Sequence, residues 1–242
     1  MKFITPSYRI LSENFTRDNV LKTIAKAART CYQSEPKGED GDVKLMLKLI
    51  NLGHEAMIEH GPDLQVSLIT CRGVTHEIVR NRLFSFAQES TRYVKYGKPD
   101  ANGIPEPMLF MLPPWIDDLH EREVLLNNEW TFGNIPDNIN EKYDLRRSTV
   151  VFIHSMANAE RDYAELIQLG WQPQQARETL PNALKTEIVI KGNPRQWRHF
   201  FELRCNKPAH PQMREWTIQL FNQLRTDIPE LWDDVAQKID LT

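Results

Sequence analysis

The most informative stretch of the chain runs Arg80-Asn81-Arg82-Leu83-Phe84-Ser85-Phe86-Ala87-Gln88-Glu89-Ser90-Thr91-Arg92-Tyr93. It gathers three guanidinium groups and three Ser or Thr hydroxyls in one short segment without glycine. A guanidinium can donate two parallel N–H groups to a phosphate or carboxylate, and neighbouring hydroxyls can complete such a site. The apolar residues between the arginines are too many for an ordinary exposed basic face. The segment predicts a site for a phosphate-bearing ligand, with a structural ion-pair cluster as the alternative.

Length and composition indicate one soluble globular domain, which we expect to span residues 1–242. The sequence is 40% hydrophobic and 26% charged, and no apolar run approaches the roughly 20 residues of a membrane span. Residues 1–6 contain no apolar signal core, so we expect a cytoplasmic protein that does not bind membranes. The net charge of −3 argues against broad nucleic-acid binding.

Neither the cysteines nor the histidines are spaced like metal ligands. Cys31, Cys71 and Cys205 are an odd, widely separated set, which is typical of reduced thiols. His54 and His60 are six residues apart and would lie about 120° apart on a helix, unlike the i,i+4 pair of a zinc protease. We therefore expect no metal. No glycine-rich phosphate loop occurs either, so any nucleotide would be held by side chains and helix ends.

Hydrophobic periodicity predicts both helices and strands. We expect strands at 64–69 and 186–190, and helices at 18–32 with Asp18 as N-cap, before Gly53, between Asn138 and Gly170, at 194–204 and from Pro211 onward. The arginine-rich segment then lies at or just after the end of an element. The proline-rich residues 97–115 are expected to form a loop that could cover a site.

A second polar segment follows Asn193. On a helix, one face would carry three residues at four-residue spacing with an arginine beside them, namely Arg195, His199, Leu203 and Arg204. This face is polar enough to line a site. Arg198 and Glu202 are expected to form an exposed i,i+4 pair.

Arg80-Asn81-Arg82, followed by seven residues and Ser90, resembles the RHR-x7-S signature of the flavin-dependent thymidylate synthases, the ThyX class. Other segments resemble blocks of this family in the expected order: Gly53-His54-Glu55, Glu59-His60, Ser85 to Tyr93, Ala176-Arg177, Leu180-Pro181, Asn193 to Phe201 and Leu203-Arg204. The resemblance covers roughly residues 15 to 225.

The resemblance implies an α+β, ThyX-like fold with a central antiparallel sheet flanked by helices, and a homotetramer with active sites shared between chains. It also implies reductive methylation of dUMP to dTMP, with 5,10-methylenetetrahydrofolate as one-carbon donor and NADPH-reduced FAD as hydride source. Substrate contacts are implied for Glu77, Arg80, Gln88, Glu89, Ser90, Thr91, Arg92, Arg177 and Arg204. Flavin contacts are implied for His54, Arg80, Asn81, Arg82, Gln88, Asn193, Arg195 and His199.

Arg204 matches the arginine that activates the uracil ring, and we expect it to be catalytic. Attack from C5 of uracil requires stabilised negative charge on the carbonyl and N3 edge, which a fixed guanidinium supplies without a covalent nucleophile. The three cysteines are therefore expected to be dispensable for the chemistry.

Two positions depart from the family pattern. Asn81 replaces the central histidine of the motif, which exchanges a ring that can be cationic and stack for a neutral amide. Glu77 stands where many members have Gln. Two alternatives stay open: a dUMP hydroxymethylase on the same scaffold, and a non-catalytic protein that binds a nucleotide or flavin.

Overall fold

The computed structural model describes residues 1–239, which divide into two compact units. The first unit contains Met1–Pro6, Ile69–Glu77 and Gln88–Ile188. The second contains Ser7–Leu68, Ile78–Ala87 and the chain from Val189 onward. The chain therefore enters each unit several times, and segments far apart in the sequence share one core.

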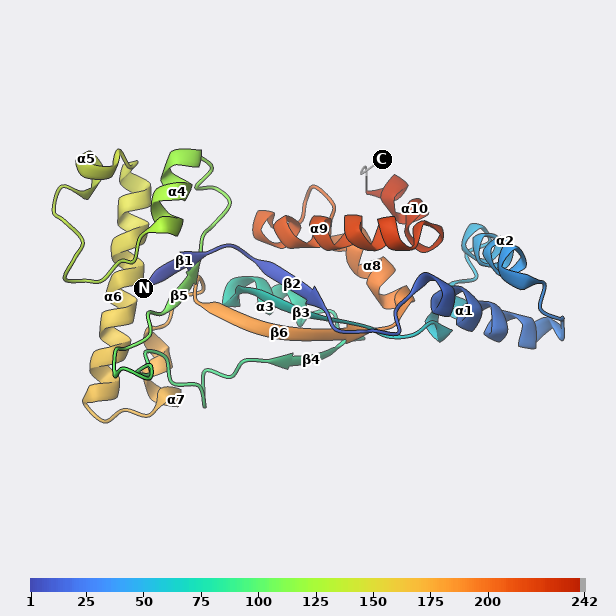
Figure 1. Ribbon diagram of the computed structural model, residues 1–242, viewed down its shortest axis with the longest axis horizontal. Helices are drawn as coiled ribbons and strands as arrows, with labels where there is room; N and C mark the ends of the chain where they lie inside the picture. The colour runs from blue at the N-terminus through green and yellow to red at the C-terminus, as the bar shows by residue number, and fades with distance from the viewer. Residues whose placement is uncertain (240–242) are drawn as a thin grey trace. The chain divides into compact units, whose positions relative to one another are not determined.

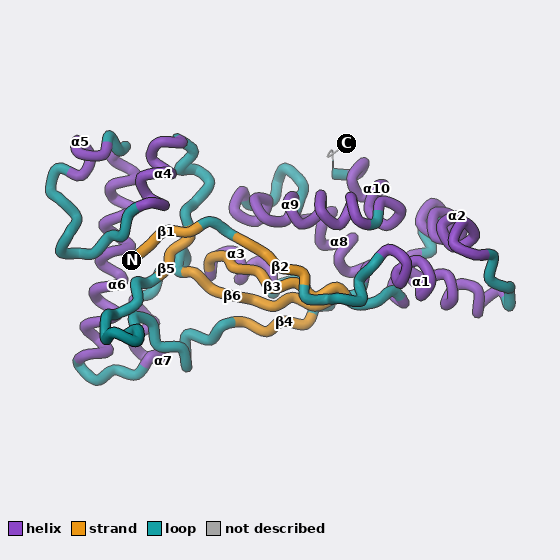
Figure 2. The backbone as a smooth tube through the Cα atoms, in the orientation of Figure 1, coloured by secondary structure: helices purple, strands orange, loops and turns teal. Residues whose placement is uncertain are grey.

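A four-stranded sheet has the strand order β2-β3-β6-β4 (Figure 2). Its strands are β2 (Ser7–Ile10), β3 (Leu64–Cys71), β6 (Lys185–Gly192) and β4 (Ser85–Gln88). Most of β3 is buried, and β6 alternates buried with partly exposed residues, as a strand with one covered face does. The two strands predicted from periodicity are confirmed, and so is the α+β class with an antiparallel sheet.

The first unit also holds a parallel pair of short strands, β1 (Lys2–Ile4) and β5 (Leu109–Met111). Its helical segments are α3 (Arg72–Ile78, whose last residue belongs to the second unit), α4 (Leu119–Asn127), α5 (Ile139–Tyr143), α6 (Arg147–Gln168), α7 (Pro173–Ala176) and η2 (Arg177–Thr179). In this unit α4 packs on β1, and α6 packs on α5 and α7 (Figure 1). Phe3, Phe110, Ile153 and Tyr163 are buried together in its core.

Two sequence predictions in the first unit were partly wrong. The predicted loop 97–115 includes the strand β5, because Leu109–Met111 pairs with β1. The helical pattern before Gly170 is broken into α5 and α6, since Asp144 has a left-handed backbone with φ +50°. An Asp tolerates this conformation, and it ends α5 there.

The second unit is mainly helical. Its elements are α1 (Arg17–Tyr32), α2 (Gly38–Asn51), η1 (Glu55–His60), α8 (Pro194–Arg204), α9 (Pro211–Asp227) and α10 (Pro229–Lys238). The N-cap of α1 is Thr16 rather than the predicted Asp18, and α10 was not predicted. In this unit α1 packs on α2 and η1, while α8 packs on η1, α9 and α10 (Figure 1). Within residues 1–239, no helix has both the length and the apolar character needed to cross a membrane.

Candidate functional site

Arg80 and Arg82 lie in the turn that follows α3, as the sequence predicted. Two hydrogen bonds to the carbonyl oxygen of Ile78 close this turn, one from the backbone N–H of Asn81 at 3.0 Å and one from its side-chain amide at 2.8 Å. The N–H of Phe84 then donates to the carbonyl of Asn81 at 3.1 Å. Asn81 therefore satisfies a carbonyl at the end of α3, which helix ends leave without an intrahelical partner.

The N-terminus of α8 is joined to the same turn. The side chain of Asn193 accepts a hydrogen bond from the N–H of Gln196 at 3.0 Å, and the Gln196 side chain accepts one from the N–H of Asn193 at 2.8 Å. This reciprocal pair is a capping box, and Pro194 takes the first helical position. The amide of Gln196 also donates to the carbonyl of Leu83 at 2.8 Å. Gln196 thus links α8 to residues 80–84.

Aromatic packing supports this junction. The ring of Phe84 meets Trp197 edge-on with centroids 5.1 Å apart, and it meets Phe200 at 5.7 Å. The indole N–H of Trp197 donates to the carbonyl of Leu64 at 3.0 Å. A Cβ at Gly192 would lie 2.6 Å from the Phe84 ring, so the close approach requires glycine.

A cavity of about 770 Å³ lies between the turn, η1 and α8, entirely within the second unit. Four arginines, three glutamates and one histidine are among the residues that line it. The lining consists of Glu55, Glu59, Arg80, Asn81, Arg82, Leu83, Phe84, Asn193, Arg195, Gln196, His199, Glu202, Leu203 and Arg204. The predicted polar face of α8, with Arg195, His199, Leu203 and Arg204, is therefore confirmed as the lining of a cavity.

The arginines of the cavity differ in their ion pairs. Arg195 lies 2.6 Å from Glu59 and 3.6 Å from Glu55. Within residues 1–239, Arg80 and Arg82 form no ion pair. Both are exposed, so their guanidinium groups can donate to an anionic ligand.

The prediction that Arg198 and Glu202 form an exposed pair was wrong. Arg198 is buried, and its guanidinium donates to both carboxylate oxygens of Asp234 at 2.8 and 2.6 Å and to Glu55 at 3.4 Å. Burial lowers the pKa of Arg198, but the hydrogen bonds that it donates to Asp234 and Glu55 and the charges of these carboxylates outweigh burial and raise the pKa above its usual value. Glu202 is paired instead with Lys238 at 2.6 Å.

Arg204 is the last residue of α8, and its side chain lines the cavity. Its carbonyl oxygen accepts a hydrogen bond from the hydroxyl of Thr217 at 3.2 Å, which fixes the end of α8 on α9. The neighbouring Cys205 is buried, and burial raises the pKa of its thiol to about 12. A thiol with that pKa is protonated at neutral pH and is a poor nucleophile.

Gln88, for which both substrate and flavin contacts were implied, lies in the first unit at the end of β4. Its side-chain amide donates to the hydroxyl of Thr75 at 2.8 Å and to that of Thr186 at 3.3 Å. Thr75 and Thr186 are fully buried, so these bonds fix the orientation of the Gln88 amide. Its carbonyl oxygen is the atom left to meet a ligand.

Glu89 follows Gln88 and makes mainly internal contacts. Its carboxylate accepts hydrogen bonds from Lys185 at 2.8 Å, from the hydroxyl of Tyr96 at 3.0 Å and from the N–H of Glu187 at 3.2 Å. Its carbonyl accepts one from Arg72 at 3.2 Å. The Glu89 side chain therefore anchors the segment that carries Ser90, Thr91 and Arg92.

Ser90, Thr91 and Arg92 form the turn beyond Glu89, with Thr91 buried and Arg92 exposed. The N–H of Arg92 donates to the hydroxyl of Ser90 at 3.3 Å, and its guanidinium donates to Gln174 of α7 at 3.2 Å. Arg177 is exposed at the start of η2, directly after α7. Arg92 and Arg177 are therefore both positioned at α7.

Eight of the predicted site residues do not line the cavity of about 770 Å³. Six of them are the residues just described, Gln88, Glu89, Ser90, Thr91, Arg92 and Arg177, and the other two are His54 and Glu77. His54 is exposed just before η1, and Glu77 lies in α3 within the first unit. Conversely, no ligand contact was predicted for Glu55, Glu59 or Glu202, although all three line the cavity. Among residues 1–239, no three His, Cys, Asp or Glu side chains are grouped so that they could hold a metal ion.

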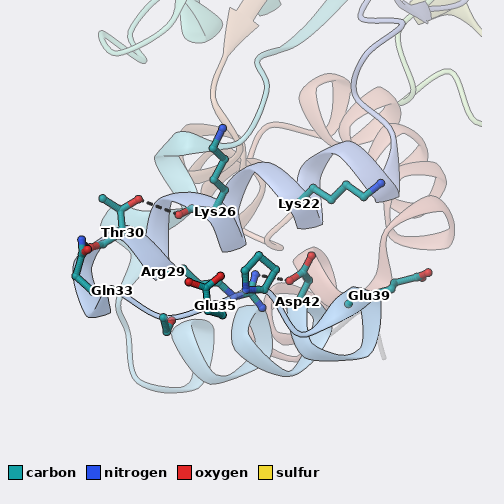
Figure 3. A pocket seen from close by; sticks show the side chains of 11 residues that line it. Lys22, Lys26, Arg29, Thr30, Gln33, Glu35, Glu39 and Asp42 are labelled. Atoms are coloured by element: carbon teal, nitrogen blue, oxygen red, sulfur yellow. Dashed lines mark hydrogen bonds and ion pairs between the residues drawn. The ribbon is translucent and has the colours of Figure 1, made fainter.

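A second cavity, of about 610 Å³, lies between α1 and α2 (Figure 3). Three cations and three carboxylates are among its lining residues, and Arg29 pairs with Asp42 across its floor. Lys22 is paired with Asp18 at 2.9 Å. None of the residues predicted for the site lines this cavity, and its balanced charges give no preference for an anion.

An α+β fold with an arginine-lined cavity at a helix N-terminus is typical of a protein that holds a phosphate-bearing ligand with side chains. Residues 13–230 match the family described as thymidylate synthase complementing protein. The flavin-dependent thymidylate synthase of Mycobacterium marinum is 30% identical over 217 residues, which cover 86% of this chain and 76% of the relative. That of Corynebacterium glutamicum is 28% identical over 226 residues, with the same coverage.

The chain therefore belongs to the family of flavin-dependent thymidylate synthases, a class of methyl-transferring enzymes. Solved structures agree on the fold. A UMP/dUMP methylase of Streptomyces cacaoi bound with 5-Br UMP superposes with a TM-score of 0.68 at 17% identity, covering 99% of this chain and 97% of the other. The family prediction made from the arginine motif is confirmed.

Proposed function

We propose that this protein converts dUMP to dTMP, with 5,10-methylenetetrahydrofolate as carbon donor and NADPH-reduced FAD as hydride source. One observation carries the proposal. Most of the residues expected to contact flavin, together with the expected catalytic residue, line a single cavity of about 770 Å³: Arg80, Asn81, Arg82, Asn193, Arg195, His199 and Arg204. These residues come from two segments more than a hundred positions apart in the sequence.

The residues present fit a flavin nucleotide. Arg80 and Arg82 can neutralise a pyrophosphate in a chain without a glycine-rich phosphate loop. The N-terminus of α8, an eleven-residue helix, adds the positive end of its dipole. Bound there, FAD would supply the hydride that completes the methyl group.

Arg204 has the role of activating the substrate. Its guanidinium can stabilise the negative charge that develops on the carbonyl and N3 edge of uracil when C5 attacks the one-carbon donor. Cys205 cannot share this role as a thiolate, because its buried thiol is protonated at neutral pH.

The substrate itself is proposed on separate observations. Gln88 presents a fixed amide, while Arg92 and Arg177 present exposed guanidinium groups that suit the phosphate of dUMP. A UMP/dUMP methylase of Streptomyces cacaoi with a similar fold has been solved with bound 5-Br dUMP.

We also propose that the working form is a cytoplasmic homotetramer of single-domain chains. Leu83 and Tyr93, exposed by 76% and 74%, support a covering partner chain.

The test is an assay with dUMP, methylenetetrahydrofolate, NADPH and FAD, in which the nucleotide product is identified by mass spectrometry. The proposal expects dTMP, no product without FAD, and at least a hundredfold loss of turnover in Arg204→Ala, on the scale of a removed transition-state donor. A hydroxymethylated nucleotide would support the dUMP hydroxymethylase instead. Bound flavin without any product would support the non-catalytic binding protein.

A further inference from the structure

The cavity of the second unit carries three carboxylates, and two of them are held by cations that do not line it. Glu55 is contacted by the buried Arg198 at 3.4 Å. Glu202 is paired with Lys238 at 2.6 Å. Neither Arg198 nor Lys238 is a lining residue, so these two carboxylates stay neutralised whether or not the cavity holds a ligand.

Glu59 is different. Within the described part of the chain, its ion pair is with Arg195, at 2.6 Å between Oε1 and Nη1. The Glu59 side chain is 47% exposed and that of Arg195 is 44% exposed. An ion pair this exposed contributes little to folding and separates easily. The pair lies inside the cavity proposed to bind the anionic part of a flavin nucleotide.

A phosphate bound by Arg195 would compete directly with Glu59. The guanidinium donates best to a phosphate when both N–H groups of one edge are available, and the carboxylate takes one of them. A carboxylate that stays beside a bound phosphate also repels it, because two like charges a few ångströms apart interact unfavourably.

We propose that Glu59 is a specificity-determining residue that occupies Arg195 in the absence of a ligand and must release it to a phosphate-bearing one. The inference rests on the proposed flavin site. A phosphate-bearing ligand must displace the Glu59 carboxylate from Arg195 before it can bind there, and this weakens its binding. Removing the carboxylate therefore strengthens the binding of phosphate-bearing ligands.

The experiment compares FAD dissociation constants, measured by quenching of flavin fluorescence, for the wild type, Glu59→Gln and Glu202→Gln. Both substitutions remove one negative charge from the lining, but of the two glutamates only Glu59 contacts Arg195, which also lies 3.6 Å from Glu55. We expect Glu59→Gln to bind FAD about fivefold more tightly, and Glu202→Gln to stay within about twofold of the wild type. Inorganic pyrophosphate should compete with FAD for Arg195. Its inhibition constant, which corrects the displacing concentration for the FAD affinity of each variant, should be lower for Glu59→Gln than for Glu202→Gln.

Weaker or unchanged FAD binding in Glu59→Gln would overturn the inference, because Glu59 would then position Arg195 or play no part. Equal tightening in both variants would also overturn it, since the effect would reflect net charge alone. Unchanged thermal unfolding of both variants checks that each is folded. If the wild type binds no FAD, the proposed flavin site fails and this inference fails with it. If the wild type binds FAD and Glu59→Gln does not improve it, only the inference fails.

Discussion

The side-chain amide of Asn81 donates a 2.8 Å hydrogen bond to the carbonyl of Ile78, the last residue of α3. Asn81 stands where the family signature has histidine, and this bond gives the amide a structural role in the turn that carries Arg80 and Arg82. Asn81→Ala should therefore lower the free energy of unfolding by about 1 kcal/mol, the usual net contribution of one hydrogen bond. Urea denaturation of both proteins measures the difference.

Asn81→His tests the same position for flavin binding. A histidine can be cationic and can stack on an aromatic ring, so the substitution should tighten FAD binding by about 1 kcal/mol and leave dUMP affinity unchanged. Titrations of one preparation with FAD and with dUMP measure both affinities. An altered product ratio at constant flavin occupancy would mean instead that Asn81 is fitted to a different reaction outcome.

Breaking the pair between the buried Arg198 and the half-buried Asp234 should be costly. Arg198→Ala leaves a carboxylate without its main partner, so we expect a loss of about 3 kcal/mol in the free energy of unfolding. Arg225→Ala is the matched control. Arg225 of α9 contacts Asp233, the neighbour of Asp234 in α10, at the surface, and its loss should cost at most about 1 kcal/mol. Equal losses in the two variants would refute the assignment of Arg198 as a buried anchor.

Glu121 should make the protein less stable in acid. It is buried in α4 and accepts hydrogen bonds from Arg146 at 2.8 Å and from Thr149 at 2.9 Å. Burial raises the pKa of Glu121, but the hydrogen bonds from Arg146 and Thr149 outweigh it and hold the pKa below its ordinary value. Its contribution to stability is therefore present above the ordinary Glu pKa and is lost as the pH falls through the lowered one.

Melting temperatures between about pH 6 and pH 3 check this, because the ordinary Glu pKa lies near 4.3. At pH 6, Glu121→Gln should have a lower melting temperature than the wild type. Between pH 6 and pH 3, its melting temperature should fall by less than that of the wild type. Glu123→Gln, an exposed change on the same helix, should follow the wild-type curve. Parallel curves for all three proteins would show that Glu121 does not titrate in this way.

The cysteines should be dispensable for catalysis. Cys71 and Cys205 are buried, and burial raises the pKa of both thiols, while Cys31 is exposed on α1. A variant with Cys31→Ser, Cys71→Ala and Cys205→Ala should still form product from dUMP. The claim fails if this variant folds and binds dUMP yet forms no product.

Short-range sequence patterns predicted most helices and strands, and they predicted the residues that α8 contributes to the cavity. Asn193-Pro194 marks the start of α8, and four-residue spacing places Arg195 and His199 on one face, so both follow from a short window. The partner of Arg198 could not be predicted this way. Spacing favoured Glu202, but Asp234 lies 36 residues away, on a helix that the sequence pattern did not predict.

The carboxylates of the cavity were missed for the same reason. Glu59 meets Arg195 across 136 positions of sequence, and periodicity holds no information on a contact of that range. In the sequence, Glu55 and Glu59 stood out only as members of two segments that resemble the family. The capping box of Asn193 and Gln196 can be predicted from the local sequence, but the bond from Gln196 to Leu83, 113 positions away, cannot.

The flavin site is tested most directly by titrating the wild type and Arg82→Gln with FAD and measuring the absorbance of protein-bound flavin. Arg82 lines the cavity and forms no ion pair within residues 1–239, so its loss should weaken binding without disturbing the fold. We predict saturable binding of one FAD per chain, about tenfold weaker in Arg82→Gln, the scale of one charge-assisted hydrogen bond. No bound flavin at saturating FAD, or equal affinity in both proteins, would contradict the assignment of this cavity as the flavin site.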